Sequence, residues 1–307
     1  FLPQKIEQGR EEDIRECIGC NICYTGDSRH VPIRCTQNPT MGEEWRRGWH
    51  PEKIDSKRSD SQILIVGAGP TGLEAARALG QRGYDVILAE ASRKLGGRVN
   101  QESQLPGLSE WGRVRDYRVN QIAKMPNVAV YLENDLALDD ILEIGADHVA
   151  IATGATWRRD GFGNYNTVAM QTLAPAESIY TPDDIMSGRF PVGSTLVYDD
   201  DGFYMGSVIA EKLRENGNSV IYLTPETKVS SWSTNNAEQS RVHRRLVELG
   251  VEIILNNGLD GFDGEQAILG CSYTGQQRNV LVENIVMVCS RTSKDELYHG
   301  LLDAIES

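Results

Sequence analysis

Four cysteines near the start of this chain constrain its fold and its chemistry more than any other feature. Cys17, Cys20 and Cys23 are separated by two residues each, and Cys35 follows after eleven further residues. Three closely spaced thiolates can bind adjacent corners of an iron–sulfur cube, and a fourth from farther along the chain can close it. The spacing therefore predicts a [4Fe–4S] cluster, and electron transfer is the first functional expectation.

A structural zinc site is the main alternative for these cysteines. Zinc sites usually pair two C-x2-C knuckles across a longer stretch, and the third cysteine here breaks that pairing. A disulfide framework fits less well, because a 307-residue chain with only Cys271 and Cys289 besides is not a small stapled domain. We expect those two cysteines to be buried packing residues.

A second strong signal is a glycine-rich turn between an apolar run and a helical pattern. Residues 63–66 read Ile-Leu-Ile-Val and lead into Gly67-Ala68-Gly69-Pro70-Thr71-Gly72. Gly67 permits the tight turn, Gly69 lets a pyrophosphate approach the backbone, and Gly72 lets the helix pack closely on the strand. The N–H groups at the helix N-terminus would face the phosphates. This context predicts a site for a dinucleotide or its ADP half.

Three further segments are expected to complete this nucleotide site. The next strand, from Asp85, ends in Glu90, whose carboxylate can accept hydrogen bonds from a ribose and would repel a 2′-phosphate. Residues 95–98, Leu-Gly-Gly-Arg, either bring a guanidinium near the phosphates or form an ordinary surface turn. A strand from His148 returns the chain to the sheet. The candidate nucleotide-binding residues are Gly67, Ala68, Gly69, Pro70, Thr71, Gly72, Glu90, Ala91, Gly97, Arg98, Thr153 and Gly154.

The remaining pattern predicts an α/β fold with two Rossmann-like lobes. Helices are expected over 110–124 and 239–249, and further strands over 128–132, 194–198, 220–223, 251–255 and 284–288. We divide the chain into an iron–sulfur segment with a linker (1–58), an ADP- or FAD-type lobe (59–160), a connection (161–190) and a degenerate NAD(P)H-type lobe (191–307).

The second lobe carries a damaged version of the glycine turn. If Gly206 is its third glycine, then Asp201 and Phe203 occupy the first two glycine positions. A carboxylate would oppose a pyrophosphate and a phenyl ring would block its approach. The sequence therefore predicts that this lobe keeps its shape without a nicotinamide cofactor.

The net charge and the distribution of apolar residues limit the kinds of partner that the chain could bind. The net charge is −13 at pH 7, which argues against nucleic acid or an anionic membrane surface as a partner. No apolar run is long enough to cross a membrane. An oxygen-sensitive cluster and unpaired thiols suit a reducing cytoplasm.

Together these motifs resemble the iron–sulfur flavoprotein amine dehydrogenases, which include trimethylamine, dimethylamine and histamine dehydrogenases, within a wider group that holds 2,4-dienoyl-CoA reductase. The resemblance spans nearly the whole chain. It rests on five segments: Glu16-Cys-Ile-Gly-Cys-Asn-Ile-Cys23, Cys35-Thr-Gln-Asn38, Gly42-Glu-Glu-Trp-Arg-Arg-Gly-Trp-His-Pro-Glu52, Val66-Gly-Ala-Gly-Pro-Thr-Gly-Leu-Glu74 and Ala152-Thr-Gly154.

The resemblance implies an enzyme in which a TIM barrel with covalent FMN oxidises an amine and passes electrons to a [4Fe–4S] cluster held by Cys17, Cys20, Cys23 and Cys35. It implies electron-transferring flavoprotein or a similar acceptor as the partner, and a homo-oligomer. The first nucleotide site holds ADP in the amine dehydrogenases and FAD in the reductases, and only the reductases bind NADPH in the second. The FMN barrel lies outside this chain, and the resemblance implies no catalytic residue within it.

Two other functions stay open at this point. One is an NAD(P)H-dependent enoate or 2,4-dienoyl-CoA reductase with FAD, FMN and a cluster. The other is an electron-transfer subunit without catalysis of its own, which would expose apolar surface near its first residues. We expect the chain to be a fragment or one subunit of a split enzyme, without a return to the first lobe at its end. Trp45, Trp49 and His50 are expected to exclude water, and Tyr117 either contacts an electron acceptor or anchors its helix.

Overall fold

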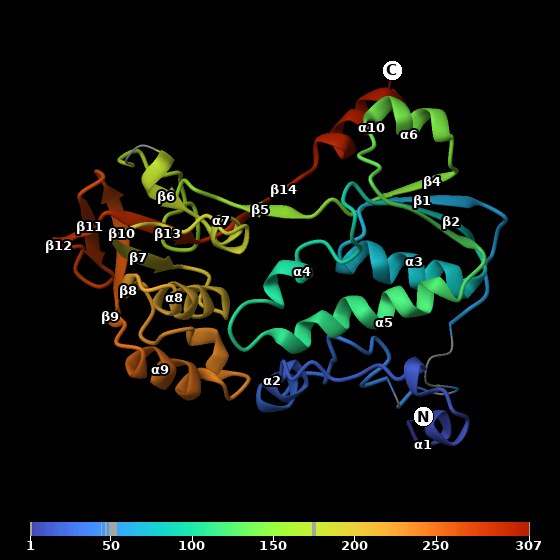
Figure 1. Cartoon of the computed structure of the whole chain (residues 1–307), viewed down its shortest axis with the longest axis horizontal. Helices are drawn as coiled ribbons and strands as arrows, with labels where there is room; N and C mark the ends of the chain where they lie inside the picture. Colours follow the sequence, from blue (N-terminus) through green and yellow to red (C-terminus); the bar gives the residue numbers. More distant parts are fainter. Residues whose placement is uncertain (1, 44, 47, 49–53, 174–175, 307) are drawn as a thin grey trace.

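The computed structural model describes residues 2–43, 45–46, 48, 54–173 and 176–306. Trp49 and His50 lie outside the described residues. The chain begins with α1 (Leu2–Glu7), the short turn η1 (Glu11–Asp13) and α2 (Ile22–Ser28), which lie beneath the first lobe in Figure 1. Within the described ranges, no helix has both the length and the apolar character needed to cross a membrane.

The first lobe is built on a parallel sheet with strand order β3-β2-β1-β4. Its elements in chain order are β1 (Gln62–Val66), α3 (Pro70–Arg82), β2 (Asp85–Ala89), α4 (Val99–Glu102), η2 (Ser109–Trp111), α5 (Gly112–Ala123), β3 (Val128–Tyr131), α6 (Leu138–Ile144) and β4 (His148–Ile151). Side chains alternate across β1. Ile63 and Ile65 pack with α3 and α5, whereas Leu64 and Val66 pack on the opposite face with α6.

The second lobe has a five-stranded parallel sheet with the order β6-β13-β7-β8-β9 and a separate antiparallel sheet, β10-β11-β12. Its elements are β6 (Ile179–Tyr180), α7 (Pro182–Met186), β7 (Ser194–Asp199), α8 (Met205–Glu215), β8 (Ser219–Leu223), η4 (Ser231–Thr234), α9 (Gln239–Glu248), β9 (Glu252–Ile254), β10 (Asn257–Phe262), β11 (Gln266–Cys271), β12 (Gln277–Leu281) and β13 (Asn284–Val288). One core lies between the five-stranded sheet and the helices, and a second between that sheet and the antiparallel strands. The expectation of two parallel α/β lobes is confirmed.

A two-stranded ribbon joins the lobes. β5 (Ala155–Trp157) leads out of the first lobe, and β14 (Arg291–Ser293) runs antiparallel to it on the way back. The ribbon crosses between the two lobes in Figure 1, and α10 (Glu296–Glu306) then lies beside α6. Leu297 and Leu301 of α10 pack against the core of the first lobe. The expectation that the chain does not return to the first lobe is therefore wrong, because these leucines complete an apolar face there.

The boundary between the lobes also differs from the expected division. β6 and α7 belong to the second lobe, although the sequence placed them in a connection over 161–190. In the other direction, Leu105 and Leu108 follow α4 of the first lobe and are buried in the core of the second. The two lobes therefore share apolar packing as well as the ribbon.

Candidate functional site

The turn after β1 leaves room for a ligand beside Gly69. Gly67 has a φ of +98°, and a Cβ there would lie 2.5 Å from the carbonyl oxygen of Ala152. A Cβ at Gly72 would overlap the carbonyl of Gly67, so α3 packs directly on the turn. A Cβ at Gly69 would meet no atom within 4 Å. The turn is thus closed on the protein side and open at the position where a pyrophosphate would approach.

The start of α3 presents its free backbone to the same open side. Gly69 is the N-cap residue with φ −69° and ψ −177°, and Pro70 occupies the first helical position. Thr71 is exposed in the first turn. A helix of this length has unpaired N–H groups and a partial positive charge at its start, both of which favour a phosphate.

Glu90 holds the turn from behind. Its Oε2 accepts a hydrogen bond from the backbone N–H of Ala68 at 2.8 Å, while its Oε1 accepts from the N–H and the hydroxyl of Ser92 at 2.9 and 2.7 Å. The side chain is almost fully buried, and Ala91 beside it is exposed. Each carboxylate oxygen has two lone pairs, so Glu90 can position the turn and still accept from a ribose. Sequence reasoning missed Ser92, which only the folded turn brings to Glu90.

Residues 95–98 lie against the glycine turn and do not form a free surface loop. The N–H of Gly96 donates to the carbonyl of Ala68 at 2.8 Å, and a Cβ at Gly97 would lie 2.9 Å from the Cα of Gly69. The guanidinium of Arg98 contacts the second lobe in this structure. Its guanidinium pairs with Asp183 of α7 at 2.6 Å and donates to the carbonyl of Ala155 at 2.7 Å. The arginine therefore links the nucleotide turn to the joint between the lobes, and does not extend a free guanidinium toward phosphates.

Thr153 and Gly154 lie where β4 meets the returning chain. The N–H of Ala152 donates to the carbonyl of Val66 at 2.7 Å, which keeps this segment beside Gly67. The hydroxyl of Thr153 donates to the carbonyl of Lys294 at 2.5 Å, and the N–H of Lys294 donates to the carbonyl of Gly154 at 3.0 Å. The predicted residues 153–154 thus border the glycine turn and the interlobe ribbon together.

The corresponding turn of the second lobe is filled by its own side chains. The ring of Phe203 packs edge-on against Tyr204 and Trp232, with centroids 4.5 and 4.6 Å apart. A Cβ at Gly206 would lie 2.6 Å from the Cβ of Asp199, so α8 packs against that side chain. The N–H of Trp232 also donates to the carbonyl of Gly202 at 3.0 Å. Packed aromatic rings thus border this turn, whereas a Cβ at Gly69 of the first turn would meet only open space.

A buried acid lies beneath the second turn. The carboxyl of Asp199 accepts from the N–H of Gly202 at 2.9 Å and from the hydroxyl of Tyr222. Full burial raises the pKa of Asp199 to about 7, despite the lowering effect of these two donors. Burial likewise raises the pKa of Asp201. These buried acids offer the phosphates of a dinucleotide no compensating positive charge, which disfavours such a ligand at this turn.

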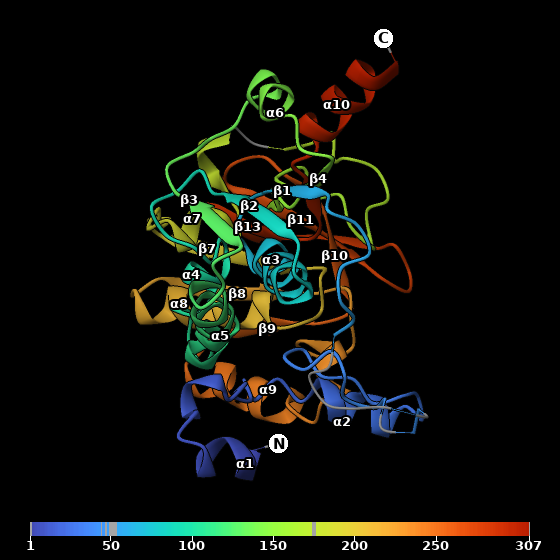
Figure 2. The ribbon, with the colours of Figure 1, turned by 90° about the vertical axis from the view of Figure 1, so that its right-hand side faces the viewer.

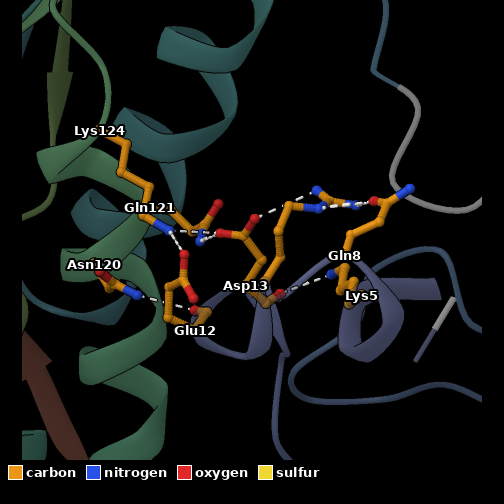
Figure 3. Close-up of polar contacts among 8 residues, drawn as sticks. Lys5, Gln8, Glu12, Asp13, Asn120, Gln121 and Lys124 are labelled. Atoms are coloured by element: carbon orange, nitrogen blue, oxygen red, sulfur yellow. Dashed lines mark hydrogen bonds and ion pairs between the residues drawn. The ribbon is translucent and has the colours of Figure 1, made fainter. Parts of the chain in front are cut away.

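The cysteine segment is anchored to α5 through polar contacts that Figure 3 displays. The amide of Asn120 donates to the carbonyl of Glu12 at 2.9 Å, and that of Gln121 to the carboxylate of Asp13, also at 2.9 Å. Lys124 bridges both acidic side chains, at 3.2 Å to Glu12 and 2.7 Å to Asp13. Lys124 and then Gln121 lower the pKa of Asp13. This contact fixes the chain just before the first cysteine.

A buried glutamine ties the two ends of the cysteine segment together. Gln37 follows Cys35 by two residues, and its amide donates to the carbonyl of Glu16, the residue before Cys17, at 3.3 Å. Its side-chain oxygen accepts from Arg118 at 2.9 Å, and Arg118 forms an ion pair with Glu74 of α3 at 2.7 Å. The two cysteine-bearing stretches are thus joined to each other and to the nucleotide lobe. The residues around Gln37 do not indicate this role, because both of its partners lie far along the chain.

The four cysteines supply the kind of donor set that a [4Fe–4S] cluster uses, but the structure does not gather their side chains into a metal site among the described residues. Within the described part of the chain, no three side chains of His, Cys, Asp or Glu surround a common point at ligating distance. The Sγ of Cys20 lies 3.2 Å from the hydroxyl of Thr36, and the N–H of Gly19 donates to the Sγ of Cys17 at 3.3 Å. Four thiols on two tethered segments match the donor set of a [4Fe–4S] cluster, and ligand loops commonly order when the metal binds.

The remaining residues singled out by the sequence have simpler surroundings. Trp45 is 78% exposed, so the expectation that it excludes water is wrong for this side chain. Cys289 is buried as expected, whereas Cys271 is only half-buried at the end of β11. The ring of Tyr117 lies under the guanidinium of Arg15, 4.4 Å from its centroid, at the point where the cysteine segment meets α5.

Comparison with known proteins agrees with this geometry. Residues 61–302 match the pyridine nucleotide-disulphide oxidoreductase family. Dimethylamine dehydrogenase of Hyphomicrobium sp. (strain x) is 37% identical over 328 aligned residues, which cover 98% of this chain and 44% of that protein. Among solved structures, histamine dehydrogenase from Rhizobium sp. 4-9 is 50% identical with a TM-score of 0.96, covering 100% of this chain and 47% of that one.

A third relative extends the comparison. The structure of 6-hydroxypseudooxynicotine amine oxidase from Pseudomonas geniculata N1 is 42% identical with a TM-score of 0.92, covering 99% of this chain and 46% of that one. The chain therefore spans less than half the length of these relatives. It belongs to the pyridine nucleotide-disulphide oxidoreductase family and corresponds to part of the amine dehydrogenases within it.

Proposed function

We propose that this chain is the electron-transfer and ADP-binding portion of an amine dehydrogenase. A small amine would be oxidised at FMN in a TIM barrel outside this chain, and electrons would pass to electron-transferring flavoprotein or a similar acceptor. The observation that carries the proposal is the contrast between the two turns. The first is open at Gly69, and the second is filled by Phe203 and Trp232.

The open turn supports a nucleotide bound through its ADP half. Gly69 leaves the space, the start of α3 supplies unpaired N–H groups, and Glu90 offers lone pairs to a ribose. A nucleotide here would stabilise the first lobe by binding only its folded form.

The filled turn argues against a reductase driven by a nicotinamide cofactor. A dinucleotide in the second lobe would have to displace a ring from a packed aromatic cluster and place its phosphates near Asp199 and Asp201. Losing such ring contacts opposes binding, and the buried acids offer the phosphates no compensating positive charge. A pyridine nucleotide would therefore lack a route for hydride through this lobe.

The cysteine segment would hold the electron carrier of this portion. Cys17, Cys20, Cys23 and Cys35 would supply the four thiolates, and a bound cluster would accept and release single electrons. The buried contacts of Ile18 with Val99 and Val114 keep one side of the cysteine loop against the first lobe. Gln37 holds the segments on either side of the cysteines together.

The Gly69→Ala variant tests the nucleotide part of the proposal. Its backbone angles suit any residue and its Cβ would touch nothing, so we expect an unchanged free energy of unfolding. The methyl group would nevertheless enter the space for the pyrophosphate. Isothermal titration with ADP, FAD and NADPH should show ADP binding to the wild type and weaker binding to the variant. NADPH binding that survives in Gly69→Ala would contradict the proposal, because it would assign an active nucleotide site to the second lobe.

A further inference from the structure

The helix that carries Cys23 is hydrogen-bonded to the second lobe at both of its ends. Asn21 is the N-cap residue of α2 and lies between Cys20 and Cys23. Its amide donates to the main-chain carbonyl of Asn236 at 3.1 Å. Ser28, the last residue of α2, shares its hydroxyl hydrogen between the carbonyl of Asn235 at 3.1 Å and that of Thr25 at 3.2 Å. Two neighbouring carbonyls of one distant loop thus hold both ends of a single helix.

That loop, residues 230–237, is itself held by the degenerate turn. The N–H of Trp232 donates to Gly202, and the Trp232 ring packs on Phe203. The amide of Asn236, which is fully buried, donates to the hydroxyl of Tyr204 at 2.7 Å. In Figures 1 and 2, α2 and α9 lie near one another at the underside of the molecule, as these contacts require. Residues 202–204 of the degenerate turn thus also hold the loop in place.

Both polar atoms of the Asn236 side chain are hydrogen-bonded in this arrangement. Its Nδ2 donates to the hydroxyl of Tyr204, and its Oδ1 accepts from the N–H of Glu238 at 3.2 Å. The ring of Tyr204 also meets Trp111, with centroids 5.9 Å apart, and Trp111 packs with Ile18 of the cysteine loop. Breaking either hydrogen bond of the buried Asn236 side chain would leave a polar group unsatisfied, so these two bonds favour one conformation of the loop.

We propose that the degenerate nucleotide turn of the second lobe serves as a clamp that positions the cysteine helix α2. Asn21 and Ser28 are positioning residues on the helix, and residues 230–237 are the clamp loop. The inference rests on the proposed function, because it gives the second lobe a role in an electron-transfer site. It accounts for the retention of a complete Rossmann-like lobe whose turn is closed to a dinucleotide.

The clamp has a physical consequence for a cluster bound beside it. The reduced state of a four-thiolate cluster carries more negative charge than the oxidised state, so water and nearby dipoles favour reduction. A helix that stays docked keeps water away from Cys23. Loss of the clamp bonds should therefore move the reduction potential in the positive direction and expose the cluster to chelators.

Three variants and one control test the clamp in the full chain after anaerobic reconstitution with iron and sulfide. Asn21→Gly removes the amide and keeps a residue suited to the φ of 53° at that position. Ser28→Ala removes the second bond from an exposed residue and should not affect folding. Tyr204→Phe removes the acceptor of Asn236 and keeps the ring. Ser272→Ala is the control, since its hydroxyl also donates to a carbonyl, that of Pro225, but in the β11–β12 turn.

The readouts are iron content, the rate of iron loss to a chelator, and the midpoint potential from a redox titration followed by electron paramagnetic resonance. We expect all variants to take up as much iron as the wild type. Asn21→Gly and Ser28→Ala should each lose iron about two- to tenfold faster, the factor that one net hydrogen bond contributes, and should have a more positive potential. Ser272→Ala should match the wild type in both.

The outcomes separate the clamp from the proposed function. Variants that match Ser272→Ala in iron loss and potential, in a chain that binds a cluster, would overturn the clamp and leave the proposed function intact. A variant with a lower melting temperature but an unchanged potential would reduce these residues to a structural role. A wild-type chain that takes up no iron would overturn the electron-transfer proposal and the clamp with it.

Discussion

Gly97 lies directly against Gly69, because a Cβ added at Gly97 would be only 2.9 Å from the Cα of Gly69. Gly96 and Gly97 thus pack against the nucleotide turn and support it from the side. Gly97→Ala should push the turn into the space for a pyrophosphate. We expect weaker ADP binding in calorimetry and a loss of stability of about 1–3 kcal/mol from overpacking.

Gly107→Ala is a matched control for that variant. Gly107 also has a positive φ, of +75°, but a Cβ there would meet no atom within 4 Å. It should show the backbone strain alone, with ADP affinity unchanged. Equal ADP affinities for Gly97→Ala and the wild type would mean that the contact with Gly69 does not shape the site.

Arg98 should contribute to the joint between the lobes more than to nucleotide binding. Its ion pair with Asp183 and its bond to Ala155 are half-buried. Arg98→Met keeps the length of the side chain and removes both interactions, so we expect a loss of about 1–3 kcal/mol in urea unfolding with ADP affinity unchanged. Arg241→Met, which breaks an exposed pair with Glu238, should cost less than about 1 kcal/mol. A selective loss of ADP affinity in Arg98→Met would instead indicate a contact with the phosphates.

Glu90 should both stabilise the glycine turn and bind the ribose of the nucleotide. Glu90→Ala leaves the N–H of Ala68 without its acceptor and removes the lone pairs offered to a ribose, so we expect ADP to bind about 1–3 kcal/mol more weakly. The side-chain oxygen of Glu90→Gln can still accept from the N–H of Ala68, so the ADP affinity of this variant should lie between those of the wild type and Glu90→Ala. Glu133→Ala, which breaks only a surface pair with Arg93, is the control and should bind ADP like the wild type.

The buried acid Asp199 predicts a specific pH dependence of stability. Its pKa is about 7 in the folded chain and near 3.8 when unfolded, so between these values the folded state binds a proton that the unfolded state has released. Its contribution to stability is therefore present below pH 3.8 and is lost as pH rises toward 7. Asp199→Asn carries no titrating group at this position. Between pH 5 and pH 8, the free energy of unfolding of the wild type in urea should fall by about 2 kcal/mol relative to that of the variant. Parallel pH curves for the two proteins would refute a neutral Asp199 in the folded state.

Local patterns predicted the parts of the fold that local residues determine. The glycine turn after β1 and the closed second turn followed from Gly67, Gly69 and Phe203, because turn geometry depends on neighbouring residues. The expected strands 128–132 and 284–288 match β3 and β13 to within a residue.

Contacts between distant residues were beyond this reasoning. The sequence did not indicate β12, whose residues 277–281 are mostly polar and exposed, or the pairing of β5 with β14. The residues around Arg98 do not indicate Asp183 as its partner, and those around Asn21 do not indicate Asn236. Tertiary packing determines both pairings. These long-range contacts carry the corrections to the candidate site and the new inference.

The most direct test of the proposed function is a release assay on anaerobically purified protein. The protein is denatured, the released nucleotide is identified by chromatography, and iron and sulfide are counted. We predict ADP without flavin, together with about four iron and four sulfide per chain. FAD in the released fraction, bleached by NADPH before denaturation, would contradict the account and place the chain with the pyridine-nucleotide-driven reductases.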